Sequence, residues 1–172
     1  MSSDLHTIAK ILTETGGTLS TAESCTGGLL AESVTSLSGS STWFRGGWVT
    51  YSNEMKETQL HVCGETLSKF GAVSWQVAKA MCVGACSASG SSVALSTTGI
   101  AGPGGATLDK PVGTVYIGCT AHGMSQVRHF VFQGDRQAIR NQASKSALEM
   151  LLNRLLKREV FQMEFQVGEV IQ

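Results

Sequence analysis

The sequence is poor in charge, and the charge it has is balanced. Only 15% of the 172 residues are charged, against about 25% in an average soluble domain, and 13 Lys and Arg offset 13 Asp and Glu. Without a basic cluster, the chain lacks the attraction that dominates non-specific nucleic-acid binding, so we expect no nucleic-acid partner. Uncharged polar residues must complete the surface. Such a surface suits contacts between identical subunits, and we expect a homo-oligomer.

Long apolar runs and paired cysteines are missing too. No segment approaches the roughly 20 apolar residues that span a bilayer, and the N-terminus is polar, so we expect neither a signal peptide nor a membrane partner. The five cysteines are an odd number without a C-x-x-C pair, which indicates a reducing compartment and predicts a cytoplasmic protein. The four histidines follow no metal-ligand spacing, so no metal site is expected.

The apolar residues that are present suffice for the core of one domain, since the hydrophobic share is 42%. Apolar spacing and turn residues predict helices at 4–15, 29–37, from Asn53, 65–70, 74–89 and 135–157. Strands are predicted at 18–23, 43–51, from Val93, 113–119 and 126–132. This order predicts an α/β sandwich, a mixed sheet flanked by helices. We assign residues 1–160 to that domain and 161–172 to a tail or an added edge strand.

The first candidate site is the turn from Ser24 to Gly28, between a predicted strand and a predicted helix. Free amides at a helix start can hold a developing oxyanion, so Ser24 would be a nucleophile beside the amides of Thr26, Gly27 and Gly28. The alternative is a helix cap at Ser24 or Thr26, with glycines that allow a tight turn. The turn by itself favours the cap.

The second candidate site runs from Tyr51 to Lys56, again after a predicted strand. If Asn53 caps the following helix, Lys56 lies in the first turn, where the dipole disfavours a cation and partial burial would lower its pKa. Such a lysine could deprotonate a serine, and Tyr51 could relay a proton. A solvated lysine and a tyrosine that fills the core are the alternatives, and for Lys56 this segment alone favours the solvated side chain.

The third candidate site is the loop 96–113, which holds five glycines and two prolines. Glycine lets backbone approach a ligand closely, so the loop is predicted to form a pocket wall, with Thr98 as a hydrogen-bond donor. It is no P-loop, because Lys110 is followed by proline instead of Ser or Thr and a helix. A purely structural turn is the alternative, although it would not need so many special positions.

The fourth candidate site is the start of the last helix, where Arg136 and Arg140 are four residues apart and share a face. Two guanidinium groups beside free helix amides would suit a phosphate. An ion pair with Asp135 or a surface glutamate is equally supported by this segment.

The four candidate sites contain the segments TAESCTGG, TYSNEMK, TTGIAGPGG with DKPVGTVYIG, and GDRQAIRNQA, in that order. Together they closely resemble the family of the C-terminal domain of CinA, the competence-damage-inducible protein, over about residues 5–157. The resemblance implies a stand-alone nicotinamide-nucleotide amidase, which would take a small nucleotide, nicotinamide mononucleotide, and release nicotinate mononucleotide and ammonia. It implies no cofactor, and it also favours a homo-oligomer.

The resemblance further implies roles for single residues. Ser24 would attack the amide, Lys56 would accept the serine proton and Tyr51 would assist. Arg140 would bind the 5′-phosphate. The remaining substrate-binding positions would be Thr26, Gly27, Thr98, Gly99, Gly102, Gly104 and Gly105. Trp75 stands where relatives commonly have an acidic residue, and it could fill part of the pocket.

Three alternatives to this function are open. The chain could be a catalytically inactive paralogue that acts as a nucleotide-binding or interaction module. It could be an amidase for another small amide. Its nucleophile could also be Cys25 in place of Ser24.

Overall fold

The computed structural model describes residues 2–121 and 123–156. The expected tail at 161–172 lies outside this range. The strands are β1 Leu19–Glu23, β2 Phe44–Val49, β3 Val93–Gly99, β4 Thr114–Ala121 and β5 Met124–Val131. The helices are α1 Ser2–Thr15, α2 Leu29–Thr35, α3 Asn53–Leu60, α4 Gly64–Phe70, α5 Trp75–Ser89 and α6 Arg136–Leu155, with a short 3₁₀ turn at Ser40–Thr42. None of these helices is long and apolar enough to cross a membrane.

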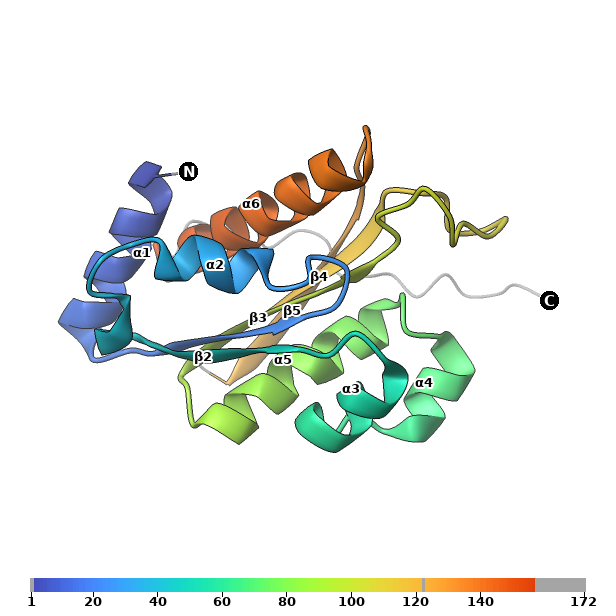
Figure 1. Ribbon diagram of the computed structural model, residues 1–172. Coiled ribbons are helices and arrows are strands. Elements are labelled where there is room, and N and C mark those ends of the chain that lie inside the picture. Colours follow the sequence, from blue (N-terminus) through green and yellow to red (C-terminus); the bar gives the residue numbers. More distant parts are fainter. Residues whose placement is uncertain (1, 122, 157–172) are drawn as a thin grey trace.

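The predicted α/β sandwich with a mixed sheet is confirmed. The strand order is β2-β1-β3-β4-β5, in which β1 runs parallel to β2 and β3, while β4 and β5 are antiparallel to their neighbours. Helices α1, α2 and α6 cover one face of the sheet, and α3, α4 and α5 cover the other (Figure 1). The central strands β1, β3 and β4 are therefore buried between two helical layers, whereas the edge strands β2 and β5 are partly exposed.

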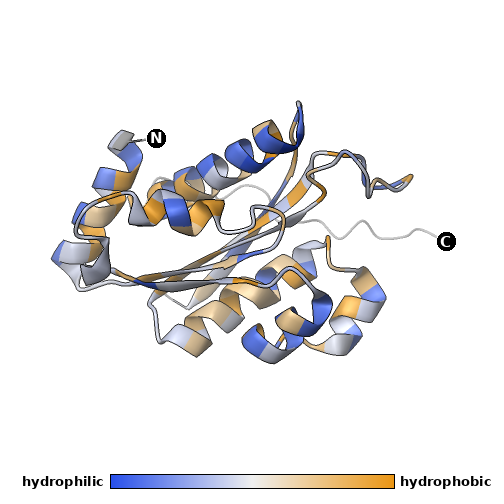
Figure 2. Cartoon of the chain, in the orientation of Figure 1, coloured by the Kyte–Doolittle hydropathy of each residue, from blue (hydrophilic) through white to orange (hydrophobic). Residues whose placement is uncertain are grey.

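Alternating side chains of the central strands supply both cores. Leu19 and Leu95 belong to the apolar cluster shared with α1, α2 and α6, whereas Ala22 and Ala94 belong to the cluster shared with α5. In Figure 2 the polar residues of α6 lie on its outer side and its apolar residues towards the sheet. Side chains that alternate along the strands thus pack against the apolar sides of the helices on both faces of the sheet.

Gly46 and Gly47 of β2 lie at a bulge and at a close approach to β1. The register between β1 and β2 skips Arg45, since Leu19 pairs with Phe44 and Ser20 pairs with Gly46. A Cβ at Gly47 would clash with the Thr21 hydroxyl. The second strand can therefore lie against β1 only with glycine at this position.

The chain separates at the carboxyl edge between β1 and β2. Helix α2 leaves β1 towards one face, and α3 leaves β2 towards the other face (Figure 1). In open α/β sheets ligands bind in the crevice that forms where the connections from two neighbouring strands leave to opposite faces. The first residues after β1 and β2 and the last residue of β3 all lie at this edge.

Candidate active site

The turn after β1 is held from both sides of the sheet edge. The amide of Ser24 donates to the carbonyl of Thr97 on β3 at 2.9 Å, and the Glu23 carbonyl accepts from the amide of Thr50 at 2.8 Å. The Ser24 side chain is half-buried at the point where these strands end. Its position is therefore determined by the sheet instead of by a free loop.

Glu23, which the sequence analysis did not single out, is buried at the end of β1, with 1% of its surface exposed. Its carboxylate accepts hydrogen bonds from the amides of Gly28 and Leu30 at 3.0 Å and of Ala31 at 2.8 Å. The side chain thus caps α2, whose N-cap residue Gly28 has no side chain of its own. The sequence does hold a signal for this residue, because Glu23 ends a predicted strand that carries no other charge.

These contacts correct the expected set of free amides. The Gly28 amide is taken by Glu23, and the Gly27 amide donates to the Ser24 carbonyl at 3.1 Å. The amides of Cys25 and Thr26 donate to no oxygen in the described part of the chain, and they lie against the Cys25 thiol. Any oxyanion site in this turn must therefore use the amides of Cys25 and Thr26.

In the turn after β2 the helix cap is Ser52, so the prediction of Asn53 was wrong by one residue. The Ser52 hydroxyl accepts from the amide of Met55 at 3.1 Å, and Asn53 is the first residue of α3. Lys56 is the fourth residue of α3. Its side chain is buried with 1% exposed, so the solvated lysine considered as the alternative is excluded.

The Lys56 amine reaches three oxygen atoms. Its Nζ lies 2.9 Å from the Thr50 carbonyl, 3.3 Å from Ser24 Oγ and 3.5 Å from the Ser52 carbonyl. No carboxylate forms an ion pair with it within residues 2–121 and 123–156. Burial lowers the pKa of Lys56 from its ordinary value of 10.5, and a weaker effect of Cys25 opposes this shift.

A pocket of about 220 Å³ opens beside these groups. It is lined by Ser24, Cys25, Tyr51, Lys56, Ala72, Val73, Thr98, Gly99, Ala101 and Arg136. Burial, aided by the charge of Glu23, raises the pKa of the Cys25 thiol to about 12, although nearby amides oppose the rise. The cysteine next to Ser24 is therefore protonated at neutral pH, which makes it a poor nucleophile.

The glycine-rich loop contributes less to the pocket than expected. Gly99 lines it, but Thr98 donates its hydroxyl proton to the Ala72 carbonyl at 2.7 Å, so the expected donor can only accept from a ligand. Gly102 accepts a hydrogen bond from Arg136, and Gly104 and Gly105 are exposed, away from the pocket lining.

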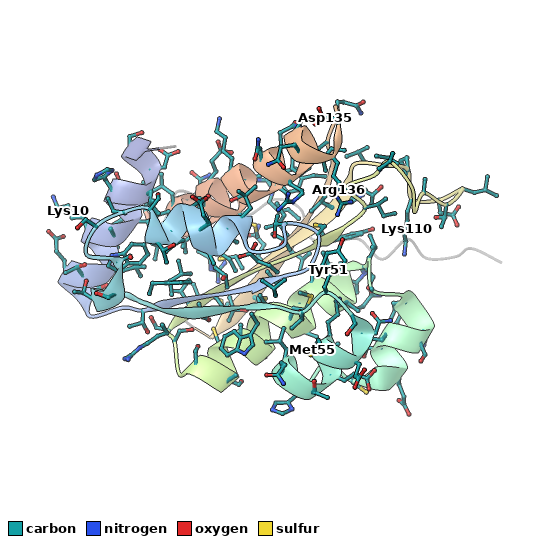
Figure 3. All side chains as sticks on the ribbon, viewed as in Figure 1. Lys10, Tyr51, Met55, Lys110, Asp135 and Arg136 are labelled. Carbon is teal, nitrogen blue, oxygen red and sulfur yellow. The ribbon has the colours of Figure 1, made fainter. Side chains whose placement is uncertain are left out.

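The two arginines of α6 have different partners. Arg136 lines the pocket and donates to the Gly102 carbonyl at 2.7 Å and to the Tyr51 hydroxyl at 2.9 Å, and Figure 3 shows Arg136 beside Tyr51. Tyr51 is 62% exposed, which excludes a core role. Arg140 instead donates through two nitrogens to the Thr26 carbonyl, at 2.7 and 3.1 Å, and it does not line the pocket.

Trp75 is the first residue of α5 and is half-buried, but Ala72 and Val73 occupy the pocket wall before that helix. Trp75 is therefore not among the residues that line this pocket. Among the described residues, no group of three His, Cys, Asp or Glu side chains is placed to hold a metal ion.

Comparison with known proteins places this architecture among close relatives. The model of the family described as "CinA C-terminal domain" matches residues 2–155 of this chain. A CinA-like protein of Citrifermentans bemidjiense is 50% identical over 88% of this chain, and a putative competence-damage inducible protein of Caldicellulosiruptor saccharolyticus is 49% identical over 84%. The chain spans 37% and 35% of the length of these two relatives.

Solved structures agree with the sequence comparison. The competence/damage inducible protein CihA from Agrobacterium tumefaciens has a TM-score of 0.82 and 42% identity, covering 87% of this chain and 95% of its own. The competence damage-inducible protein A (ComA) from Klebsiella pneumoniae has a TM-score of 0.87 and 32% identity, covering 91% and 98%. This chain therefore belongs to the CinA C-terminal domain family.

Proposed function

We propose that the chain is a serine and lysine amidase that hydrolyses the carboxamide of nicotinamide mononucleotide to nicotinate mononucleotide and ammonia. The observation that carries this proposal is the distance of 3.3 Å between Lys56 Nζ and Ser24 Oγ, in a buried setting where no carboxylate of the described residues forms an ion pair with the amine. A nucleophilic hydroxyl needs a base within hydrogen-bond reach, and a lysine can act as that base only when it is uncharged.

The oxygen atoms around Lys56 can accommodate an uncharged amine that accepts the Ser24 proton. Two of the three are backbone carbonyls, which can only accept, while the Ser24 hydroxyl can also donate. A neutral amine has two N–H donors and one lone pair. Its donors can therefore go to Thr50 and Ser52, which leaves the lone pair for the Ser24 proton.

The reaction would proceed in two halves. The Ser24 Oγ bonds to the amide carbon while its proton passes to Lys56, and the amides of Cys25 and Thr26 receive the charge on the carbonyl oxygen. Lys56 then gives that proton to the leaving nitrogen as the carbon–nitrogen bond breaks, releasing ammonia. Water attacks the acyl-enzyme and gives one proton to Lys56, which passes it to Ser24 Oγ as the bond between that oxygen and the acyl carbon breaks. The acid product then loses its remaining proton to solvent and leaves as the carboxylate.

For the nucleotide, Arg136 is the better phosphate ligand than Arg140. Arg136 lines the pocket and uses two of its five N–H donors on Gly102 and Tyr51, whereas Arg140 is committed to the Thr26 carbonyl. Gly99 and the Thr98 hydroxyl would lie against the pyridine and ribose. Tyr51 would orient Arg136 and border the entrance, in keeping with its exposure.

The test is ammonia release from nicotinamide mononucleotide by the wild type, Ser24→Ala and Lys56→Met. Ser36→Ala and Lys10→Met, two exposed positions, are the matched controls. We expect release by the wild type and both controls and none by the two site variants. Release that persists in Ser24→Ala would exclude this nucleophile. Calorimetric binding of the nucleotide without turnover by the wild type would instead support the inactive binding module.

A further inference from the structure

The buried carboxylate of Glu23 does more than end a helix. A helix cap usually comes from the residue directly before the helix, but Glu23 reaches α2 from β1, across the turn that carries Ser24. It therefore joins the two ends of that turn. Any shift of Ser24 relative to α2 would have to break hydrogen bonds to this one side chain.

The same carboxylate extends into a second chain of contacts. The Thr26 hydroxyl lies 2.7 Å from Glu23 Oε2 and 2.7 Å from the Thr97 hydroxyl. Because a carboxylate only accepts, Thr26 donates to Glu23 and accepts from Thr97. Since the Thr97 carbonyl also accepts from the Ser24 amide, the contacts form a closed frame around the turn.

Two consequences follow for the groups at the pocket. The frame sets the position of Ser24 at 3.3 Å from Lys56 Nζ. It also takes up the amides of α2 nearest the turn, whereas the amides of Cys25 and Thr26 donate to no oxygen among the described residues. Arg140 completes the arrangement, because its two bonds to the Thr26 carbonyl hold the outer side of the turn.

We infer that Glu23 is a positioning residue for attack by Ser24, acting through Thr26 and the start of α2 without touching the substrate. The inference rests on the proposed function, since it concerns the reactivity of Ser24. It predicts that loss of the carboxylate slows the nucleophile while the base stays as it is. Displacement of a reacting group by about 1 Å can reduce a rate about 10²-fold.

An alkyl fluorophosphonate tests this without depending on the natural substrate. Ser24 Oγ forms a bond to phosphorus, the phosphorus–fluorine bond breaks, and the serine proton passes to Lys56 as fluoride leaves. The labelling rate of the full chain is measured for the wild type, Ser24→Ala and Glu23→Gln, at a temperature where circular dichroism shows each protein folded.

Two controls match the Glu23 variant in charge and in helix stability. Glu32→Gln removes an exposed carboxylate from α2, and Val34→Ala weakens the buried side of the same helix. We expect Glu23→Gln to label about 10²-fold more slowly than the wild type. Both controls should label at the wild-type rate even where Val34→Ala lowers the melting temperature.

The pH profile separates positioning from a charge effect. Burial and Cys25, and not Glu23, shift the pKa of Lys56. We therefore expect Glu23→Gln to lower the plateau of the labelling rate and to leave its midpoint unchanged. A midpoint that moves with an unchanged plateau would overturn the inference.

Thr26 supplies a second test should Glu23→Gln fail to fold. Thr26→Val keeps the shape but loses the hydroxyl, and Thr26→Ser keeps the hydroxyl. We expect slow labelling in the first and near wild-type labelling in the second. Equal rates in this pair, or a wild-type rate in Glu23→Gln, would overturn the inference alone. A wild type that labels no faster than Ser24→Ala would overturn the proposed function and the inference together.

Discussion

The end of β1 and the start of α3 each bury one acidic or basic side chain beside the pocket, and they surround it in opposite ways. Glu23, the last residue of β1, faces three amides and a hydroxyl, all of which donate to it. Lys56, after β2, faces two carbonyls and a hydroxyl, without an ion pair to a carboxylate in the described residues. Hydrogen-bond donors therefore surround the first group, and only uncharged acceptors surround the second.

This difference separates a structural group from a reactive one. A buried acid with a full set of donors holds its surroundings in place. A buried amine without a counter-charge has its pKa lowered by burial, so it loses its proton at a lower pH than an exposed lysine does. The groups that contact a buried ionisable residue therefore indicate whether that residue has a structural or a reactive role.

The largest effect is expected from removing the base. Lys56→Met fills the same buried space without an amine, so ammonia release should fall by about 10³-fold or more. Lys56→Arg should be equally inactive, because a guanidinium stays protonated. Both are measured with protein shown to be folded by circular dichroism. Activity above a tenth of the wild type in either variant would contradict the role of Lys56.

The opposite turn should lose stability. Glu23→Ala leaves three amides and the Thr26 hydroxyl without an acceptor, so the free energy of unfolding should fall by roughly 3 kcal/mol. Urea unfolding measures it, with Glu32→Ala as the exposed control, for which a change of less than about 0.5 kcal/mol is expected. Similar losses in both variants would mean that the contacts of Glu23 do not stabilise the turn.

The pH dependence should follow the uncharged amine. The rate should rise about tenfold per pH unit until Lys56 is deprotonated, with a midpoint below its ordinary pKa of 10.5. Between the lowered pKa and 10.5 the unfolded chain binds more protons at Lys56 than the folded one, so the contribution of Lys56 to stability increases with pH there. The difference in unfolding free energy between wild type and Lys56→Met isolates this contribution. A midpoint at or above pH 10.5 would refute the lowered pKa.

A smaller effect should distinguish the two arginines. Arg136→Ala should raise KM for nicotinamide mononucleotide about tenfold with little change in kcat, because it removes a phosphate contact. Arg140→Ala should lower kcat more than it raises KM, because Arg140 holds the turn. The corresponding nucleoside, which lacks the phosphate, is the control substrate. An equal effect of Arg136→Ala on nucleotide and nucleoside would argue against phosphate binding.

The smallest effect is expected at Cys25. With its pKa raised to about 12, the thiol is protonated at neutral pH. Cys25→Ala should therefore reduce ammonia release by less than about threefold, since only its amide is proposed to contact the substrate. A loss comparable to that of Ser24→Ala would return the cysteine to consideration as the nucleophile.

The fold was largely predictable from local patterns. Apolar spacing identified α1, α5 and α6, and the apolar residues Val77, Met81 and Ala85, which recur every four residues along α5, are all buried. The error at the start of α3 was a choice between two adjacent capping residues. Ser52 prevails over Asn53 because its backbone is extended and its hydroxyl reaches the Met55 amide.

The site was predictable only in part. The structure brings together Ser24 and Lys56, which the sequence separates by a helix and a strand. Arg136 and Arg140 share one helical spacing, so no local rule could say which faces the pocket. Glu23 was overlooked because its partners, the amides of α2, are backbone groups that leave no trace in residue types.

The sequence by itself determined the order of the elements, the two apolar layers and the residue types at the sheet edge, since each depends on periodicity and near neighbours. Only the tertiary structure decided which amides are taken, which arginine enters the pocket and how deeply the lysine is buried. Those features depend on distances between segments that are far apart in the chain, and burial controls the protonation on which the proposed chemistry depends.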